Sequence, residues 1–356
     1  MKLALAIVAL LAGGSFALAQ SAPTNSLPNP YRSIENWGTL PAGRAWGSTS
    51  AVAIDPDGTS VWVGERCGES RPPSRIDPGQ PFACDGSNLD PILKFDSSGK
   101  LLKSFGAGLL LFPHGLYVDR EGNVWVTDSG AEAAVATATK AGLKAGHIVR
   151  KFSPDGQVLM TLGEPGVGGD DEYHFRSPSG VVTAPNGDIF VADGHFTNNR
   201  IVKYSKDGKF IKAWGKTGYA PGEFQVPHCI AMDKRGRLFV CDRTNARIQI
   251  FDQDGKFLAR WHQFGMPSGI AFSVNDEDLI YVFDSESDNV ENPGFEQGIR
   301  IGDALNGWVK HFILDQGGYP SSRTGSGPEF GTVDKFGNVF AGEPRPRVLR
   351  KYVKVR

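Results

Sequence analysis

One segment pattern recurs along the chain, and this repeat limits the possible folds more than any other feature. Its clearest copies are PHGLYVDREGNVWVTD at 113–128, PSGVVTAPNGDIFVAD at 178–193 and PHCIAMDKRGRLFVCD at 227–242. Looser copies occupy 48–65, 267–284 and 328–343. Each copy alternates apolar and polar residues, turns at Gly, Asn or Asp, and alternates again before it ends in an acid. That pattern is typical of a β-hairpin.

A second hairpin follows the copies, and two hairpins make a four-stranded antiparallel unit. Examples are RIVKYSKDGKFIKAW at 200–214 and RIQIFDQDGKFLARW at 247–261. Six such units predict an all-β fold, a six-bladed β-propeller. The last unit lacks a fourth strand, and YRSIENWG at 31–38 resembles the fourth-strand pattern KFIKAWG at 209–215. We therefore expect an N-terminal strand to complete the last blade and close the ring.

The N-terminus predicts export. An apolar run follows Met1 and Lys2, is too short to span a bilayer comfortably, and ends in Ala-Leu-Ala. We expect a signal peptide at 1–19, an N-terminal segment with the ring-closing strand at 20–46, and the propeller at 47–356. An uncleaved membrane anchor is the alternative.

The charge balance excludes some partners. The chain has 38 Lys and Arg residues against 39 Asp and Glu residues. This balance gives no field that would draw the protein to nucleic acid or to a bilayer surface. We expect a secreted or periplasmic monomer with no nucleic-acid partner, and no membrane partner after signal cleavage.

The long connections predict which face of the propeller is used. In an antiparallel blade, the connection between the second and third strands and the connection to the next blade lie on one face. The long segments are all of these two kinds: 66–91, 129–146, 163–177, 285–296 and 315–327. Long loops on a rigid scaffold are where sites tend to be built, so we place the site on this face.

The first position of the innermost strands forms a ring around the central channel. Its members are Ser50, His114, Ser179, His228, Ser268 and Glu329. His114, His228 and Glu329 belong to alternate blades and are expected to converge near the axis. Two imidazoles and a carboxylate suit zinc or another divalent transition metal with open positions. The alternative is that all ring residues only hydrogen-bond neighbouring blades.

A second ring consists of the acids that end the second strands. Its members are Glu65, Asp128, Asp193, Asp242, Asp284 and Glu343. We expect these acids to cap turns or to pair with the Arg that opens the third strand. Arg66 and Arg243, which follow two of the acids, face the mouth, where their guanidinium groups could hold a carboxylate. A surface salt bridge is the alternative for each Arg.

The repeats are NHL-type repeats, and the chain resembles the peptidyl-α-hydroxyglycine α-amidating lyase family. The resemblance lies in LFPHGLYVDREGNVWVTD, YHFRSPSGVV, DIFVADGHFTNNRIVKYSKDGKFIKAWGK, GEFQVPHCIAMD and VCDRTNARIQIF. It covers blades 1 to 4 well and the rest more weakly. It implies a carbon–nitrogen lyase that converts an α-hydroxyglycine peptide end into a peptide amide and glyoxylate.

The resemblance also implies roles for four residues. That family uses three zinc-binding His, two Arg near the substrate carboxylate, a catalytic Tyr and a structural calcium. By motif, His114 in FPHG and His228 in VPHC match two zinc ligands. Arg66 in GERC and Arg243 in CDRT match the two Arg.

The chain departs from that family at three positions. Where the family has its third zinc His and then an Asp, this chain has Glu329 and Phe330. Glu329 can still bind the metal, but Phe330 lacks the carboxylate that helps hold calcium, so a structural calcium is doubtful. His195 replaces the family's Tyr and can serve as the base, because His titrates near neutrality. A surface-loop His is the alternative.

We therefore expect a metal-dependent lyase-like enzyme that acts on a peptide C-terminus or on another small carboxylated substrate. Its expected catalytic residues are Arg66, His195 and Arg243, and its expected metal ligands are the three convergent ring residues. The alternative is a non-catalytic NHL propeller that binds a protein or glycan partner through the long-loop face. The motifs alone do not separate the two, because a fold does not fix a function.

The four Cys residues fall into two pairs. Cys67 and Cys84 flank a loop with no core of its own, and a disulfide there would add roughly 3 kcal/mol in an exported chain. Cys229 and Cys241 lie on paired strands of blade 4. In the expected register His228 faces Cys241, which points the two Cys to opposite faces. We expect two buried thiols, with a bulge-dependent disulfide or a Cys241 metal ligand as alternatives.

Overall fold

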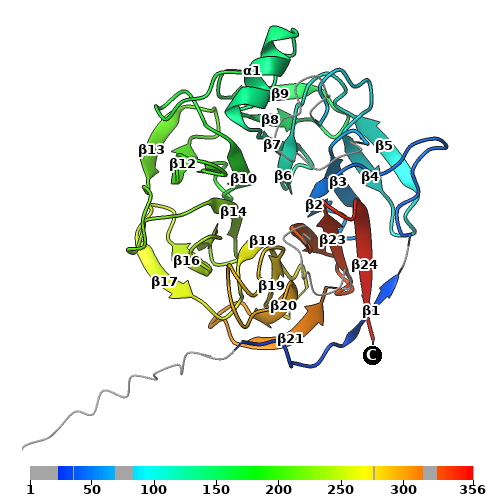
Figure 1. Cartoon of the computed structure of the whole chain (residues 1–356), viewed down its shortest axis with the longest axis vertical. Helices are drawn as coiled ribbons and strands as arrows, with labels where there is room; N and C mark the ends of the chain where they lie inside the picture. Colours follow the sequence, from blue (N-terminus) through cyan, green and yellow to red (C-terminus); the bar gives the residue numbers. More distant parts are fainter. Residues whose placement is uncertain (1–22, 35, 69–82, 276, 316–326, 356) are drawn as a thin grey trace, which may run out of the picture.

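The computed structural model describes residues 23–34, 36–68, 83–275, 277–315 and 327–355. Within these residues the chain forms six antiparallel four-stranded sheets around a central axis (Figure 1). This arrangement is the six-bladed propeller that the repeat predicts. In each blade the first strand lies innermost and the fourth lies at the rim.

Blades 1 to 3 each use four consecutive strands. Blade 1 contains β2 (Thr49–Ile54), β3 (Val61–Glu65), β4 (Ile92–Phe95) and β5 (Leu101–Phe105). Blade 2 contains β6 (Pro113–Val118), β7 (Val124–Asp128), β8 (Ile148–Phe152) and β9 (Val158–Leu162). Blade 3 contains β10 (Pro178–Thr183), β11 (Ile189–Asp193), β12 (Arg200–Tyr204) and β13 (Phe210–Trp214).

Blades 4 and 5 repeat this order, and blade 6 takes its outer strand from the N-terminus. Blade 4 contains β14 (Pro227–Met232), β15 (Leu238–Asp242), β16 (Arg247–Phe251) and β17 (Phe257–Trp261). Blade 5 contains β18 (Pro267–Phe272), β19 (Leu279–Asp284), β20 (Gly298–Asp303) and β21 (Val309–Leu314). Blade 6 contains β22 (Phe330–Val333), β23 (Val339–Glu343), β24 (Val348–Lys354) and β1 (Tyr31–Ile34).

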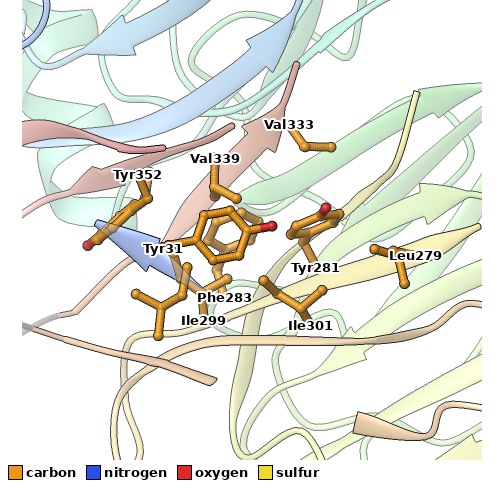
Figure 2. Packing of buried hydrophobic residues seen from close by; sticks show 11 residues of the cluster. Tyr31, Leu279, Tyr281, Phe283, Ile299, Ile301, Val333, Val339 and Tyr352 are labelled. Carbon is orange, nitrogen blue, oxygen red and sulfur yellow. The ribbon is translucent and has the colours of Figure 1, made fainter. Parts of the chain in front are cut away.

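The N-terminal strand closes the ring, as the sequence predicts. β1 pairs with β24 in antiparallel register, from Tyr31 opposite Lys354 to Ile34 opposite Lys351. Tyr31 is buried in a cluster that blades 5 and 6 share with it, beside Tyr281 and Tyr352 (Figure 2). The closing segment therefore supplies core packing as well as strand pairing.

A β-bulge interrupts the start of the first strand in blades 1 to 5. In blade 4, Pro227 pairs with Asp242 and Cys229 pairs with Cys241, so the intervening His228 has no partner in the ladder. The same shift occurs between Pro178 and Gly180 in blade 3. A bulged residue leaves the alternation of the strand. The ring position of each of these blades is thereby released from strand pairing.

The structure corrects one prediction about the Cys residues. Cys67 and Cys84 form the expected disulfide. Cys229 and Cys241 are also joined by a disulfide, so the prediction of two buried thiols, and with it a thiol ligand at Cys241, is wrong. The reason is the bulge, which shifts the register by one residue and sets the two Cys opposite each other.

One helix, α1 (Glu132–Lys140), lies in the long connection of blade 2. Its buried Val135 and Ala138 pack against Leu111 and Phe112 beside the channel mouth. Among the described residues, no helix is long and apolar enough to cross a membrane. The predicted signal peptide at 1–19 lies outside the described residues, and the predicted segment boundaries stay predictions.

Tyr31→Ala tests the contribution of the closing strand. Tyr31 is 7% exposed, so its loss should lower the free energy of unfolding by about 3 kcal/mol through lost burial and a cavity. Arg32→Ala, at the exposed neighbouring position of β1, is the matched control and should change it by less than about 0.5 kcal/mol. Denaturant unfolding measures both, and equal stabilities of the two variants would show that β1 does not contribute to the core.

Candidate metal centre

Four side chains with metal-ligand chemistry converge at the channel mouth. They are His114, His195, His228 and Glu329, and one ligand atom from each lies within 4.8 Å of all the others. Three of them are the ring residues that the repeat places together. The fourth, His195, comes from the loop between β11 and β12. His114 and His228 are fully buried, and their ring centroids lie 4.7 Å apart.

Hydrogen bonds between blades fix the orientation of both ring imidazoles. Nδ1 of His114 donates to the carbonyl oxygen of Ser179 at 3.0 Å, and Nδ1 of His228 donates to that of Ser268 at 2.7 Å. Because a carbonyl only accepts, Nδ1 carries a proton in each ring, and the other ring nitrogen, Nε2, faces the channel. In each ring one nitrogen therefore joins the blades, and the other lies among the side chains that could hold a metal ion.

The electrostatics of the cluster favour a bound cation. Oε1 of Glu329 lies 3.4 Å from Nε2 of His114 and 3.2 Å from Nε2 of His228. Burial, with the nearby charge of Arg243, lowers the pKa of His228 to about 3. Burial raises the pKa of Glu329, but the two imidazoles outweigh it and hold that pKa well below the usual range. Two imidazole Nε2 atoms and a carboxylate oxygen thus face one another at short range, an arrangement that a metal ion between them would satisfy.

His195 occupies the mouth side of this cluster. Its backbone N–H donates to the carbonyl oxygen of Ser177, and its ring centroid lies 4.5 Å from that of His114. Its buried Nδ1 finds no hydrogen-bond partner among the described residues. Burial, and then the neighbouring His114 and His228, lower the pKa of His195 well below its usual value. The ring is therefore neutral and can accept a proton or bind a metal, and it is not a surface-loop His.

The acids that end the second strands have the structural role that the sequence predicts. Asp193 accepts from Nε of Arg200 at 2.9 Å, and Asp242 accepts from Nε of Arg247 at 2.6 Å. Asp128 instead accepts from backbone N–H groups of the preceding loop, including Phe112 at 2.6 Å. Burial raises its pKa to about 6. These carboxylates hold the loops around the mouth and lie inside the blades.

The two Arg residues lie on opposite sides of the ring of blades. The guanidinium of Arg66 stacks 3.7 Å above the ring centroid of Phe112 and donates to Oγ of Ser50 at 3.0 Å. Arg243 lies 3.8 Å from the carboxylate of Glu286 and is partly exposed. Its charge lowers the pKa of both His195 and His228, which places it close to the metal-ligand cluster.

Sequence reasoning missed Glu286 at this mouth. Burial raises the pKa of Glu286, while Arg243 lowers it in part. The signal was present in the repeat, because Glu286 is the second residue after the acid Asp284, as His195 is after Asp193. His195 was predicted from the family resemblance rather than from the repeat, and the resemblance names no residue at the position of Glu286.

The position that would help hold calcium in the resembled family is apolar. Phe330 is buried and packs against the Cys229–Cys241 disulfide. Its ring centroid lies 5.5 Å from that of His114 and 5.3 Å from that of His228. This side chain offers no oxygen to a calcium ion.

Comparison with known proteins supports the repeat assignment. The NHL repeat model matches residues 175–204 and 224–251, so the chain contains NHL repeats. It is 39% identical over 154 residues to peptidyl-glycine alpha-amidating monooxygenase A of Xenopus laevis, covering 41% of this chain and 15% of that protein. It is 38% identical over 136 residues to a probable peptidyl-alpha-hydroxyglycine alpha-amidating lyase of Caenorhabditis elegans, covering 37% and 34%.

A relative with a different name matches a larger part of the chain. NHL repeat-containing protein 3 of Homo sapiens is 31% identical over 203 residues, covering 55% of this chain and 50% of that protein. The matched region thus spans half or less of each of these relatives. The comparisons agree with the predicted resemblance to amidating lyases at the level of the repeat family.

The pKa of His228 predicts how the metal-free protein responds to acid. The pKa of His228 is near the ordinary histidine value of 6.5 in the unfolded chain, whereas burial lowers it to about 3 in the folded protein. The unfolded state therefore binds more protons between these values, and this contribution to stability is lost as the pH falls through that window. In the presence of a metal chelator, the free energy of unfolding of wild type should fall with decreasing pH more steeply than that of His228→Asn. The difference in slope should reach up to about 1.4 kcal/mol per pH unit. Asn can retain the bond to Ser268. Denaturant unfolding between pH 7 and pH 4 measures this difference, and parallel profiles would contradict it.

Proposed function

We propose that the protein is an exported, metal-dependent lyase-like enzyme that acts on a C-terminal α-hydroxyglycine or a closely related small carboxylated substrate. The observation that carries the proposal is the cluster in which two imidazoles, both oriented by backbone carbonyls, and an anionic carboxylate face one another. Similarity to proteins named as amidating lyases and monooxygenases supports the reaction type. Two disulfides support export, because disulfides persist in oxidising compartments.

We assign the metal to His114, His228 and Glu329, which together would leave positions open for substrate. Zinc or another divalent transition metal would supply Lewis acidity to an oxygen of the substrate. Phe330 argues against a structural calcium beneath it. The backbone carbonyls of Ser179 and Ser268, which accept from the Nδ1 atoms, keep both imidazoles in the ligating tautomer.

The remaining mouth residues have distinct roles in this proposal. Arg66 and Arg243 bind the substrate carboxylate, because a planar guanidinium can donate two parallel hydrogen bonds to it. The stacking of Arg66 on Phe112 and its bond to Ser50 limit its motion and aim its remaining donors. Glu286 holds Arg243 from the solvent side until substrate binds.

His195 moves the proton in the proposed reaction. Its neutral ring accepts the proton of the substrate hydroxyl while the C–N bond breaks and the carbon–oxygen bond becomes a carbonyl. The proton then passes to the departing nitrogen, which leaves as an amide, and glyoxylate remains on the Arg pair. The reaction consumes neither oxidant nor water, because the amide and glyoxylate together contain every atom of the substrate. The low pKa of His195 keeps the acceptor form populated at neutral pH.

Metal binding and product release test this function together. The purified protein should bind one divalent ion per chain and release glyoxylate and peptide amide from an α-hydroxyglycine peptide. His114→Asn should lose the metal and the activity but stay folded, since Asn can keep the bond to Ser179 while removing Nε2. Ser179→Ala, a ring position without a ligand atom, is the matched control and should keep the metal. Metal analysis, product assay and circular dichroism measure these outcomes.

Two results would count against this function in different ways. A full equivalent of metal in His114→Asn would show that the channel site is wrong. A metal-loaded wild type that releases no glyoxylate would favour the non-catalytic alternative, a propeller that binds a protein or glycan through its long-loop face. The similarity to NHL repeat-containing protein 3, whose name states no enzymatic activity, is the observation that supports this alternative.

The assigned roles of Arg66, Arg243 and His195 predict variants that keep the metal but lose turnover. Arg66→Lys and Arg243→Lys should each lower kcat/KM by roughly 10-fold or more, because Lys cannot form the bidentate fork. His195→Ala should lower kcat by about 100-fold, the usual size of a general acid–base contribution. Metal content and kinetics, measured on the same samples, check these outcomes. Loss of metal in His195→Ala would instead make His195 a fourth ligand.

A further inference from the structure

The residue that follows each ring residue in the sequence forms the next level of the channel, and most of these residues are very small. They are Ala51, Gly115, Gly180, Cys229, Gly269 and Phe330. Four of the six are Gly or Ala, and the reason is the approach of the next blade. A Cβ on Gly180 would lie 3.2 Å from Cα of Cys229, and one on Gly269 would lie 2.9 Å from Cα of Phe330. The fold therefore favours very small side chains at this level.

Blades 4 and 6 carry larger side chains at this level, Cys229 and Phe330, and these two side chains belong to one buried cluster. Cys229 and Phe330 are 2% and 9% exposed and form one buried cluster with Cys241. The ring of Phe330 also contacts the imidazoles of His114 and His228 from below. The disulfide and the phenyl ring thus lie directly under the metal-ligand cluster.

A cavity of about 340 Å³ begins on the other side of this layer. Its lining includes Gly115, Gly180, Cys229 and Phe330, but none of the six ring residues. The disulfide and Phe330 therefore form a floor that separates the metal-ligand cluster from the lower channel. We call this layer, made of Cys229, Cys241 and Phe330, the channel floor.

Each part of the channel floor is bonded to a segment that carries a metal-ligand residue. Cys229 follows His228, which the bulge leaves without a ladder partner. The disulfide makes the next rung, Cys229 opposite Cys241, covalent. Phe330 follows Glu329, whose backbone N–H donates to the carbonyl oxygen of Gly342 at the start of the β22–β23 pairing. Motion of either segment would move a ligand atom, and the packed floor opposes that motion.

We propose that the Cys229–Cys241 disulfide and the Phe330 ring that packs on it are positioning residues, which hold His228 and Glu329 at ligand distance from one metal ion. The inference rests on the metal site of the proposed function and extends it. It also explains why the small-residue rule is broken in the two blades whose ring residues need to be held. Residues that orient metal ligands typically contribute 10- to 100-fold to metal affinity.

Co²⁺ is a suitable probe, because its visible spectrum reports the geometry of its ligands. The Cys229→Ala/Cys241→Ala variant should bind Co²⁺ about 10- to 100-fold more weakly than wild type and with an altered spectrum. The Cys67→Ala/Cys84→Ala variant is the matched control, since it also loses one disulfide but none of its changed residues lies in the channel floor. It should keep the wild-type affinity and spectrum. Unfolding in chelator separates this effect from a general loss of stability.

A second pair of variants tests the phenyl ring. Phe330→Ala should weaken Co²⁺ binding in the same direction, because the cavity it leaves lies beneath both imidazoles. Phe336→Ala removes a phenyl ring from the same blade, but Phe336 is 65% exposed and lies in the β22–β23 turn. It should leave Co²⁺ binding unchanged. Equal affinities for the two Phe variants would overturn the role of Phe330.

The cross-link can also be tested without any substitution in the channel floor. In the Cys67→Ala/Cys84→Ala background, Cys229–Cys241 is the one disulfide left among the described residues, so reduction acts on it alone, and a thiol count on the unfolded protein verifies that this buried bond is broken. Reduction should weaken Co²⁺ binding as the substitutions do, even if the double Ala variant fails to fold. Unchanged affinity and spectrum after reduction would overturn the inference while leaving the metal site intact. Failure of wild type to bind Co²⁺ would overturn the proposed function and this inference together.

Discussion

The bulge at the start of the innermost strand is the constraint on which the site depends. It frees the ring residue of blades 1 to 5 from the ladder, and in blades 1 to 4 the side chain of that residue hydrogen-bonds the next blade. Oγ of Ser50 donates to the carbonyl oxygen of His114 at 3.1 Å, and His114 and His228 donate in the same way to the blades that follow them. Oγ of Ser179 donates to the carbonyl oxygen of Pro227 at 2.5 Å. A single interaction type thus joins neighbouring blades and sets the imidazole tautomers.

This dual use explains why a structural and a functional role need not compete at a repeat position. Ser and His can both donate one hydrogen bond to a carbonyl, so either residue satisfies the blade contact. His retains a second nitrogen after that bond is made, whereas Ser retains no comparable ligand. Replacing Ser by His in alternate blades therefore adds ligand atoms at the axis without changing the way the blades are joined.

The repeat made the fold and most of the site predictable, because its period determines equivalent positions. It placed His114, His228 and Glu329 together, paired Asp193 with Arg200, and assigned β1 to blade 6. The bulge was not visible, since it lies at the first residues of the strand, before the hydrophobic alternation that marks the strand begins. That one extra residue led to the wrong prediction for Cys229 and Cys241. Glu286 was missed because the loops vary in length and sequence between blades, so the repeat does not define equivalent positions within them.

Two departures from the resembled lyase family, Glu329 and Phe330, are neighbours in sequence and are related in the structure. That family has a neutral His and then an Asp where this chain has Glu329 and Phe330, so one carboxylate remains but moves up by one residue. The carboxylate of Glu329 thereby lies at the level of the imidazoles, 3.2 Å from Nε2 of His228. The next position, where the resemblance implies a calcium-binding carboxylate, instead holds a phenyl ring that packs on the Cys229–Cys241 disulfide. In this chain a covalent and apolar layer therefore packs beneath the cluster at the position where the resembled family has a charged side chain.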